Sequence, residues 1–402
     1  MTAGRCAILI LAILASPLGA AAQTRAEIAQ QARAEKSKSL HKYKPGKVER
    51  GLFLVEDRHL VERIFNPPNG LFVRVGGLPQ GSGLPLGPGY RLSNDKASVM
   101  GYGVLAPFSG YWDVGSELSF NHLFHHHAFV AAGARRMDLP QEDFFGIGID
   151  SNKDLKTSYA LKQSVFHVRG GNNPGDMFQL VGRVAYETPR QRPGEDTRIP
   201  SIEDVYTPSQ APGLFQDTDF LRTGATFTID LSDFPLGPRS GGQYIFDVEK
   251  FSDRNLNRFS FSQWTVDLRQ FVPIVQGARS IAVRLYATGV SPDAGNEVPY
   301  YYMPTLGGAY MVRGLANYRF RDRNVVFTNV EYRYQLNAFM TGVAFFDAGT
   351  VAPTVSALTS NNLKWDYGFG VRFGFLGATT VRTELSFGAE GPRIVFKFSD
   401  VF

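Results

Sequence analysis

The fold is decided by the stretch Trp365-Asp366-Tyr367-Gly368-Phe369-Gly370-Val371-Arg372-Phe373-Gly374-Phe375. Every odd-numbered residue in it is large and apolar, and every even-numbered residue is Asp, Gly or Arg. Because successive side chains of a β-strand point to opposite faces, this pattern predicts a strand with one face suited to hydrocarbon and the other to water. A transmembrane β-barrel has such strands, whereas a soluble sandwich carries its charges on the outer face.

The same alternation recurs from about residue 70 to the end of the chain, in strands of about 10–12 residues, the length that a tilted strand needs to cross a bilayer. The sequence therefore predicts an all-β fold, a transmembrane antiparallel β-barrel of sixteen strands over residues 70–402, preceded by a short N-terminal helix. The predicted strands are 70–78, 83–93, 97–107, 111–122, 127–137, 157–170, 177–188, 219–231, 242–252, 258–271, 279–291, 324–335, 340–349, 363–375, 378–388 and 391–402.

Loop lengths give an independent indication of topology. Connections after the even-numbered predicted strands are mostly tight, as at 94–96. Outer-membrane barrels have short periplasmic turns and longer outer loops, so we expect both ends of the barrel domain on the periplasmic side. The four long connections all follow odd-numbered strands, and they lie near 138–156, 189–218, 292–323 and 350–362.

Composition excludes several classes of protein. The chain has 402 residues, of which 43% are apolar and 13% aromatic, too many for a disordered protein. Its one cysteine, Cys6, falls in a segment that we expect to be removed, so thiol chemistry and a disulfide framework are excluded. The 42 Lys and Arg exceed the 37 Asp and Glu only slightly, and we expect no nucleic-acid partner.

The N-terminal residues predict export. A basic start, an apolar core over residues 6–15 and the small residues Ala20-Ala21-Ala22 are typical of a secretory signal peptide, 1–22, with a buried N-terminal helix as the alternative. Residues 23–69 are then expected to form a periplasmic lead, with a short amphipathic helix within 51–65. We therefore expect the protein in the outer membrane of a Gram-negative bacterium.

The chain ends in Ile394, Phe396, Phe398 and Phe402, which share one face of the last predicted strand. An aromatic end on an amphipathic strand resembles the recognition signal of outer-membrane barrels, although Asp400 interrupts the apolar face. The alternative, an ordinary edge strand, would leave an exposed aromatic edge prone to aggregation. We therefore predict that this strand closes against the first one.

The most specific motifs lie between residues 304 and 349. The segment Pro304–Leu315 includes the sequence Gly-Gly-Ala-Tyr-Met-Val-Arg-Gly and lies in a long outer loop. On the next strand the apolar residues take the lipid side, so Glu331 points into the lumen, and Asp347 on the following strand can do likewise. An arginine reaching down from the loop, Arg313, suits such a pair, because its planar fork binds carboxylates bidentately and stays charged.

These motifs resemble the signature of the BamA/TamA superfamily, also called the bacterial surface antigen family. The resemblance covers about residues 70–402 and is most specific over 304–349, although Leu315 replaces the aromatic residue that usually follows the Val-Arg-Gly motif. It implies that the sixth outer loop enters the lumen and that its arginine pairs with strand acids. The matching positions are Gly307, Gly308, Val312, Arg313 and Gly314 in the loop, Glu331 and Asp347 as lumenal partners, and Phe345 and Gly349 on the strand.

The resemblance implies a barrel that inserts or translocates proteins. Its partners would be outer-membrane lipid and lipopolysaccharide, the barrel-assembly machinery for its own insertion, and client proteins. Residues 23–69 are too few for a POTRA module, so a separate periplasmic partner is a further expectation. The alternatives are a diffusive pore or structural protein and, third, a hydrolase. No G-x-S-x-G motif supports the last, so we expect no enzyme activity and no cofactor.

Two other clusters carry weaker signals. His122, His125, His126 and His127 lie at a predicted periplasmic turn and offer imidazoles to a metal. No carboxylate is interleaved with them and neighbouring strand residues point apart, so we assign no metal site. The glycine-rich run 76–83 lacks the features of a phosphate-binding loop and is interpreted as a hairpin turn.

Overall fold

The computed structural model describes residues 46, 60–126, 128–172, 177–234, 237–275, 278–337, 339–375, 378–398 and 400–402. The predicted signal peptide and most of the predicted periplasmic lead lie outside these residues. The chain divides into residues 1–58 and residues 59–402, and the second unit contains the sheet.

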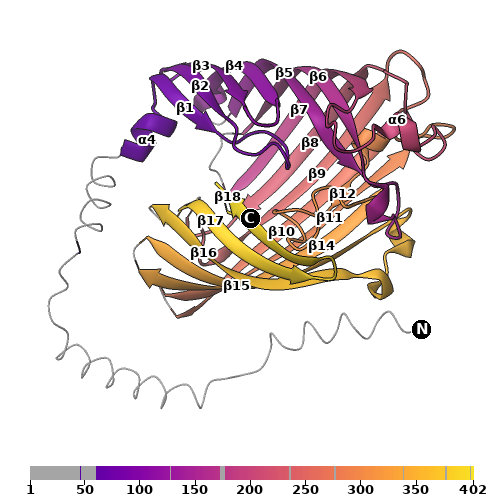
Figure 1. Ribbon diagram of the computed structural model, residues 1–402. Helices are drawn as coiled ribbons and strands as arrows, with labels where there is room; N and C mark the ends of the chain where they lie inside the picture. The colour runs from indigo at the N-terminus through magenta and orange to yellow at the C-terminus, as the bar shows by residue number, and fades with distance from the viewer. Residues whose placement is uncertain are drawn as a thin grey trace. The chain divides into compact units, whose positions relative to one another are not determined.

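One antiparallel sheet of sixteen strands makes up this second unit, and each strand pairs with its neighbours in chain order. Both the all-β class and the number of strands are confirmed. Figure 1 shows the sheet curving around, so that the first strands face the last ones across an interior. Its strands are β1 (Gly70–Val75), β2 (Leu86–Ser93), β3 (Ala97–Leu105), β4 (Trp112–His122), β5 (Ala128–Phe144), β6 (Thr157–Asn172), β7 (Phe178–Pro193), β8 (Phe220–Asp230), β9 (Gly241–Asp253), β10 (Phe261–Val275), β11 (Arg279–Pro292), β14 (Asn324–Asn337), β15 (Met340–Ala352), β16 (Lys364–Phe375), β17 (Ala378–Gly388) and β18 (Gly391–Lys397).

Short elements lie between the strands. The predicted N-terminal helix is present as α4 (Leu60–Phe65), and the remainder of its predicted range lies outside the described residues. The described part of the chain contains no helix of the length and hydropathy needed to cross a membrane. The other short elements are α5 (Leu123–His126), α6 (Ile202–Val205), η1 (Lys153–Leu155), η2 (Tyr300–Tyr302), η3 (Val355–Ala357), η4 (Ser360–Asn362) and the two-stranded sheet of β12 (Thr305–Leu306) and β13 (Phe320–Arg321).

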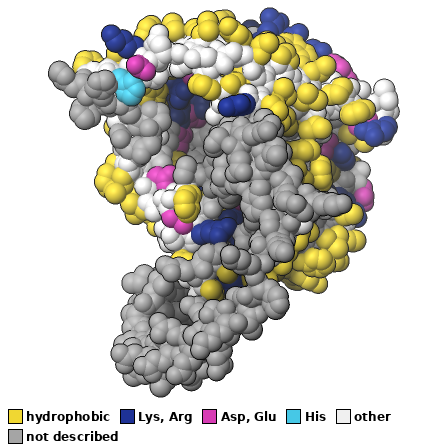
Figure 2. Space-filling model, turned by 90° about the vertical axis from the view of Figure 1, so that its left-hand side faces the viewer, with side chains coloured by type: hydrophobic (Ala, Val, Ile, Leu, Met, Phe, Trp, Pro, Cys, Tyr) yellow, Lys and Arg dark blue, Asp and Glu magenta, His cyan; other side chains and the backbone are white. Residues whose placement is uncertain are grey.

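The two faces of the sheet differ as the alternation predicts. On β16, the side chains of Trp365, Tyr367 and Phe369 are 54–59% exposed, whereas Asp366 and Arg372 on the opposite face are at most 3% exposed. In Figure 2, hydrophobic side chains lie along the outer surface and charged side chains gather in the opening. An apolar outer surface and a charged interior are what a bilayer requires of a barrel.

Several strand ends differ from the predicted ones. The first two strands are shorter because Gly76, Gly77, Gly81 and Gly83 adopt positive φ, which ends the extended backbone. The fifth strand instead continues to Phe144, into the segment predicted as a loop. The four connections predicted to be long remain on one end of the sheet, after β5, β7, β11 and β15.

The first and last strands are not paired with each other. Among the described residues β1 pairs only with β2, and β18 only with β17, so the predicted hydrogen-bonded closure is not formed. The two ends of the sheet nevertheless share the lining of a pocket of about 350 Å³, to which Val75 and Phe398 both contribute. Over the residues that the structure describes, the sheet is therefore a barrel whose seam has no strand pairing.

The predicted strand 391–402 was too long, since β18 ends at Lys397. Asp400 is drawn into the lumen by Arg372, whose Nη1 donates to its Oδ1 at 2.6 Å. The ring of Phe402 stacks on that of Phe271, with centroids 6.2 Å apart, and Phe271 is buried inside the barrel. Phe402 therefore does not share the outer face of Phe396 and Phe398, which are 55% and 42% exposed.

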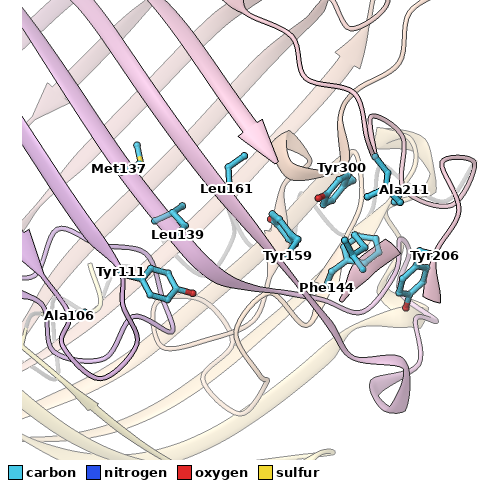
Figure 3. Packing of buried hydrophobic residues seen from close by; sticks show 12 residues of the cluster. Ala106, Tyr111, Met137, Leu139, Phe144, Tyr159, Leu161, Tyr206, Ala211 and Tyr300 are labelled. Carbon is cyan, nitrogen blue, oxygen red and sulfur yellow. The ribbon is translucent and has the colours of Figure 1, made fainter. Parts of the chain in front are cut away.

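Hydrophobic residues cover the outer end of the barrel. Phe144 at the end of β5, Tyr206 after α6 and Tyr300 of η2 pack edge to face, with ring centroids 4.9–5.3 Å apart (Figure 3). Ile202 of α6 and Leu214 join the same cluster. Because the cluster joins the end of β5 to the connections after β7 and β11, these segments hold one another in place.

We predict that Arg198→Cys, in the exposed connection after β7, reacts with a membrane-impermeant maleimide in intact cells. Asp95→Cys, in the tight turn after β2, should react only after the cells are permeabilised, because the predicted topology places that turn on the periplasmic side. Both positions are exposed, so accessibility in the folded chain does not distinguish them. Labelling of Asp95→Cys in intact cells would contradict the topology.

Candidate functional site

The long connection between β11 and β14, residues 293–323, is the sixth connection at the outer end, and we call it loop 6. Its base is the small hairpin in which Leu306 of β12 pairs with Phe320 of β13. Gly307 and Gly308 follow at φ 122° and 101°, a region that side chains disfavour. A Cβ at Gly307 would collide with the carbonyl oxygen of Ala316, so glycine is required where the loop turns inward.

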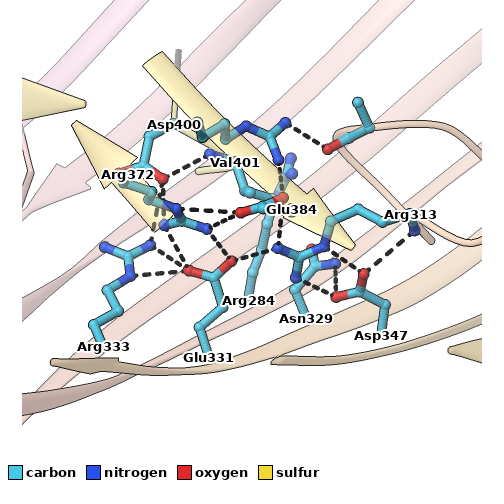
Figure 4. Close-up of polar contacts among 12 residues, drawn as sticks. Arg284, Arg313, Asn329, Glu331, Arg333, Asp347, Arg372, Glu384, Asp400 and Val401 are labelled. Carbon is cyan, nitrogen blue, oxygen red and sulfur yellow. Dashed lines mark hydrogen bonds and ion pairs between the residues drawn. The ribbon is translucent and has the colours of Figure 1, made fainter. Parts of the chain in front are cut away.

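At the tip of loop 6, Arg313 is completely buried and lies between acidic residues of the barrel wall (Figure 4). Its Nε donates to Asp347 Oδ2 at 2.6 Å and its Nη2 to Asp347 Oδ1 at 2.7 Å, a bidentate pair. Its Nη1 donates to Glu331 Oε1 at 2.9 Å. The structure thus brings together the three residues that the sequence predicts to interact.

The fixed charge of this arginine follows from its surroundings. Burial lowers the pKa of the Arg313 guanidinium, but the carboxylates of Asp347, Glu331 and Glu384 outweigh that effect and hold the pKa well above its ordinary value. The guanidinium also lies 3.5 Å from the centroid of the Phe345 ring, a cation–π contact. Arg313 is therefore a permanent cation in a site closed to water.

The remaining motif residues make this approach of loop 6 to the wall possible. A side chain at Gly314 would clash with Asp366, whose Oδ2 accepts a hydrogen bond from the Gly314 backbone N–H at 2.5 Å. A side chain at Gly349 would meet Leu306 and Phe327. Small residues are needed wherever loop and wall touch.

Hydrophobic contacts hold the same loop from its other side. Val312 is fully buried, and Leu315 is 5% exposed in the cluster that joins the loop to β14 and β15. The leucine that replaces the usual aromatic residue is therefore still a packing residue. Loop 6 is anchored by apolar contacts as well as by charge.

The charged network is larger than the sequence predicts. Glu384 of β17 accepts from Arg313 Nη1 at 3.2 Å, and Arg372 of β16 donates to Glu384 and Glu331 at 2.8 and 2.6 Å. The alternation in the sequence shows that the side chains of Arg372 and Glu384 point into the lumen. It does not show the strand register that places them next to Glu331. Among the described residues, four arginines meet four carboxylates here: Arg313, Arg333, Arg372 and Arg382 with Glu331, Asp347, Glu384 and Asp400.

Arg372 joins loop 6 to the end of the chain. One of its nitrogens, Nη1, donates both to Glu331 and to Asp400, at 3.0 and 2.6 Å. Beyond Asp400, the Phe402 ring lies 5.2 Å from the guanidinium carbon of Arg333, which itself donates to Glu331 at 2.9 Å. Glu331 is thus shared between the residues that hold loop 6 and those that hold the last segment of the chain.

The opposite wall also holds loop 6. The hydroxyl of Tyr302 in η2 donates to Glu187 Oε2 of β7 at 2.9 Å and accepts from Gln163 of β6 at 3.3 Å. Glu187 is in turn paired with Arg222 of β8 at 2.9 Å. Sequence analysis missed this second anchor, since nothing in the run of three tyrosines indicates which wall it meets. Loop 6 therefore spans the lumen from one wall to the other.

The histidine cluster is only partly described by the structure. His122 ends β4 and adopts a φ of 59°, and the following residues form α5. His127 lies outside the described residues, as do the side chains of His125 and His126. Among the residues that the structure describes, no group of three or more His, Cys, Asp or Glu is arranged to hold a metal.

Comparison with known proteins identifies the fold. The family model for the Omp85 superfamily domain matches residues 106–384, more than half of the chain. The chain belongs to the Omp85 superfamily. Superfamily members of this kind are outer-membrane proteins of Gram-negative bacteria, and the predicted BamA/TamA-type barrel is confirmed.

A solved structure of BamA agrees at the level of the fold. A BamA from Haemophilus ducreyi that lacks POTRA domains 1–3 has a TM-score of 0.61 and 12% identity, over 82% of this chain and 69% of that one. CdiB from Escherichia coli has a TM-score of 0.49 and 13% identity, over 82% of this chain and 59% of that one. No curated protein sequence matches the chain.

For this Omp85 barrel, Arg313→Ala should cost roughly 3–5 kcal/mol of stability, because it leaves the buried Asp347 without its cation. We expect faster proteolysis within loop 6 and loss of the folded band at a lower temperature on gels. In this variant Glu331 and Glu384 still pair with Arg372, so Asp347 is the carboxylate that loses its arginine partner.

Adding Asp347→Asn to Arg313→Ala should recover most of the lost heat resistance, since the stranded charge is removed. Arg323→Ala, a half-buried arginine at the end of the same loop, is the matched control and should behave as the wild type. If Arg313→Ala leaves protease and heat resistance unchanged, the arginine does not hold the loop.

Proposed function

We propose that this Omp85 barrel inserts or translocates client proteins, with loop 6 held in the lumen by a lock between Arg313 and the wall acids. The observation that carries the proposal is the complete burial of Arg313 among Asp347, Glu331 and Glu384. Burying these charges costs desolvation free energy, so the cluster is weak evidence for stability alone. A simple pore would gain no advantage from it.

The seam supports the same proposal. The terminal strands β1 and β18 have only six and seven residues, and in the described part of the chain they are not paired with each other. Unpaired edges are templates for an incoming strand. A client segment can therefore be bound there without an external energy source, and the Glu331–Arg372–Asp400 chain links that edge to the lock.

A diffusive pore is the alternative, and the packing argues against it. Loop 6 contacts both walls, through Arg313 on one side and Tyr302 on the other. The aromatic cluster around Phe144 and Tyr300 covers the outer end. An open channel requires a lumen free of such contacts.

The remaining expectations become part of the proposal. We take residues 1–22 to be a signal peptide removed on export and 23–69 to be a periplasmic lead ahead of the barrel. The client proteins, a separate periplasmic partner, lipopolysaccharide and the barrel-assembly machinery remain the proposed partners. No enzyme activity and no cofactor enter the mechanism.

The purified chain, reconstituted into liposomes, should accelerate insertion of an urea-unfolded client barrel and should show low conductance in planar bilayers. The double variant Arg313→Ala with Asp347→Asn keeps the barrel folded but frees loop 6, so insertion should fall while folding is normal. Arg198→Ala, on the exposed outer connection, is the control and should insert the client at the wild-type rate.

High steady conductance of the wild type with no insertion activity would favour the diffusive pore. Normal insertion by the double variant would mean that the lock is a static brace. Either result contradicts the proposed role of Arg313.

We also propose that Phe396, Phe398 and Phe402 form the signal by which the barrel is recognised for assembly. Phe396→Ala with Phe398→Ala, on the outer face, should lower outer-membrane abundance without affecting export. Phe402→Ala should also lower abundance, and because it removes a lumenal contact with Phe271 it should lower heat resistance as well. Unchanged abundance of the double variant would remove the outer-face residues from the signal.

A further inference from the structure

Two pockets adjoin at the seam between β1 and β18. The smaller one, of about 350 Å³, is lined by the connection after β1, by Tyr310 of loop 6 and by the end of β18. The larger one, of about 600 Å³, is lined by Phe65 of α4 and by residues of β1 and β2. Val75, Leu84 and Phe398 line both pockets, so a single ligand can occupy the two together.

The larger pocket is apolar apart from one arginine. Val73, Leu86 and Phe398 in its lining are exposed side chains, and the alternation along their strands places them on the outer face of the sheet. In a membrane, hydrocarbon is the surrounding that such side chains require. The larger pocket therefore suits an acyl chain.

The smaller pocket contains a lysine. Lys397 alternates with the outward Phe396 and Phe398, and its Nζ lies 5.9 Å from the centroid of the Tyr310 ring. Lys397 forms no hydrogen bond or ion pair with any residue that the structure describes. The side chain is half-buried and its ammonium nitrogen keeps accessible surface, so a ligand in the pocket can reach it.

A second cation borders the same space. Arg74 lines the larger pocket, and its guanidinium carbon lies 3.7 Å from the centroid of the Tyr102 ring. A Cβ at Gly77, which lines the smaller pocket, would lie 3.2 Å from Arg74 Nη2, so the guanidinium reaches that pocket as well. Within the described part of the chain Arg74 has no acidic partner, and its nitrogens keep accessible surface.

These two cations differ from the arginines of the lock. Arg313 and Arg372 are paired with carboxylates of the barrel wall. Neither pocket at the seam has an Asp or a Glu among the residues described in its lining. The charges of Lys397 and Arg74 are therefore available to an anion from outside the chain, and both side chains are suited to a phosphate group.

We propose that the seam binds one anionic phospholipid, with its phosphate at Lys397 and Arg74 and an acyl chain in the larger pocket. An uncharged hydrocarbon would leave the two cations without an anion, and a small anion would leave the apolar pocket unfilled. Basic pockets in membrane proteins bind phosphate-bearing headgroups in the same way.

The lining also indicates the source of the lipid. Phe65 belongs to α4, which precedes β1 and lies on the periplasmic side in the predicted topology. We therefore assign a phospholipid of the periplasmic leaflet and not lipopolysaccharide of the outer one. The inference goes beyond client insertion, because a lipid can bind at the seam whether or not a client does.

The test is native mass spectrometry of the delipidated full chain in detergent. Phosphatidylglycerol should bind as one molecule and more tightly than phosphatidylcholine with the same acyl chains, since each cation contributes about fivefold. Inorganic phosphate and lipid A, titrated in parallel, should bind more weakly than phosphatidylglycerol. No client is present, so the result is independent of insertion activity.

Three outcomes would overturn the proposal. Equal affinity for the two phospholipids would mean that the cations do not contact the headgroup. Inorganic phosphate bound as tightly as phosphatidylglycerol would mean that no acyl chain is recognised. Tightest binding of lipid A would assign the site to the outer leaflet.

Variants of the cations test the headgroup contact. Lys397→Gln and Arg74→Gln should each lower the affinity for phosphatidylglycerol about fivefold and leave that for phosphatidylcholine nearly unchanged. Lys397→Arg keeps the charge and should keep the preference. Arg136→Gln is the matched control, because Arg136 is an exposed arginine of β5 that also lacks a described partner and lines neither pocket. Wild-type preference in both glutamine variants would exclude these cations from the site.

Val73→Trp tests the acyl chain. The larger side chain fills part of the apolar pocket, so the affinity for both phospholipids should fall while the ratio between them is kept. The folded band on gels checks that the barrel is intact. Wild-type affinity in this variant would place the acyl chain outside the larger pocket.

Discussion

A guanidinium with no access to water needs its charge and its N–H donors satisfied by the protein, and Arg313 meets this need only when loop 6 lies inside the barrel. Its partners come from β14, β15 and β17, strands that lie within one run of the sheet, β14-β15-β16-β17. The position of the loop and the closure of this wall therefore depend on each other. Either one alone would leave buried charges without partners.

Ion pairs extend the mutual dependence of loop 6 and the barrel wall through the lumen. Arg372 is bound by Glu331, Glu384 and Asp400, so the end of the chain shares its partners with loop 6. Charges in one network respond together, because removal of any member changes the environment of the rest. The geometry links the lumenal loop to the last segment of the sheet, next to the seam that has no backbone pairing.

The outer end follows a different principle. There the connections are held by aromatic packing around Phe144, Tyr206 and Tyr300, and loop 6 contributes to both the packing and the charged network. One part of loop 6 is thus held by aromatic packing and another part by ion pairs.

The sequence by itself determined the strand count, the two faces of each strand and the inward direction of Glu331 and Asp347. The alternation of apolar and polar residues is a local property of the sequence. In a bilayer it allows one orientation of the strand, with the apolar residues facing the lipid. Arg313 was identified through the resemblance of its motif to the BamA/TamA superfamily, and arginine suits two carboxylates because its planar fork binds them bidentately. Several strand ends differ from the predicted ones, because positive-φ glycines and tertiary contacts shorten or extend a strand.

Only the tertiary structure decided which residues share the lumen. The presence of Glu384 and Arg372 beside Arg313 depends on register across three strands, and a shift of one residue would turn each side chain to the lipid. The inward turn of Asp400 and Phe402 depends on Arg372 and Phe271, far away in the chain. Tyr302 meets Glu187 only because the sheet curves around. These are long-range pairings, and no local pattern of residues specifies them.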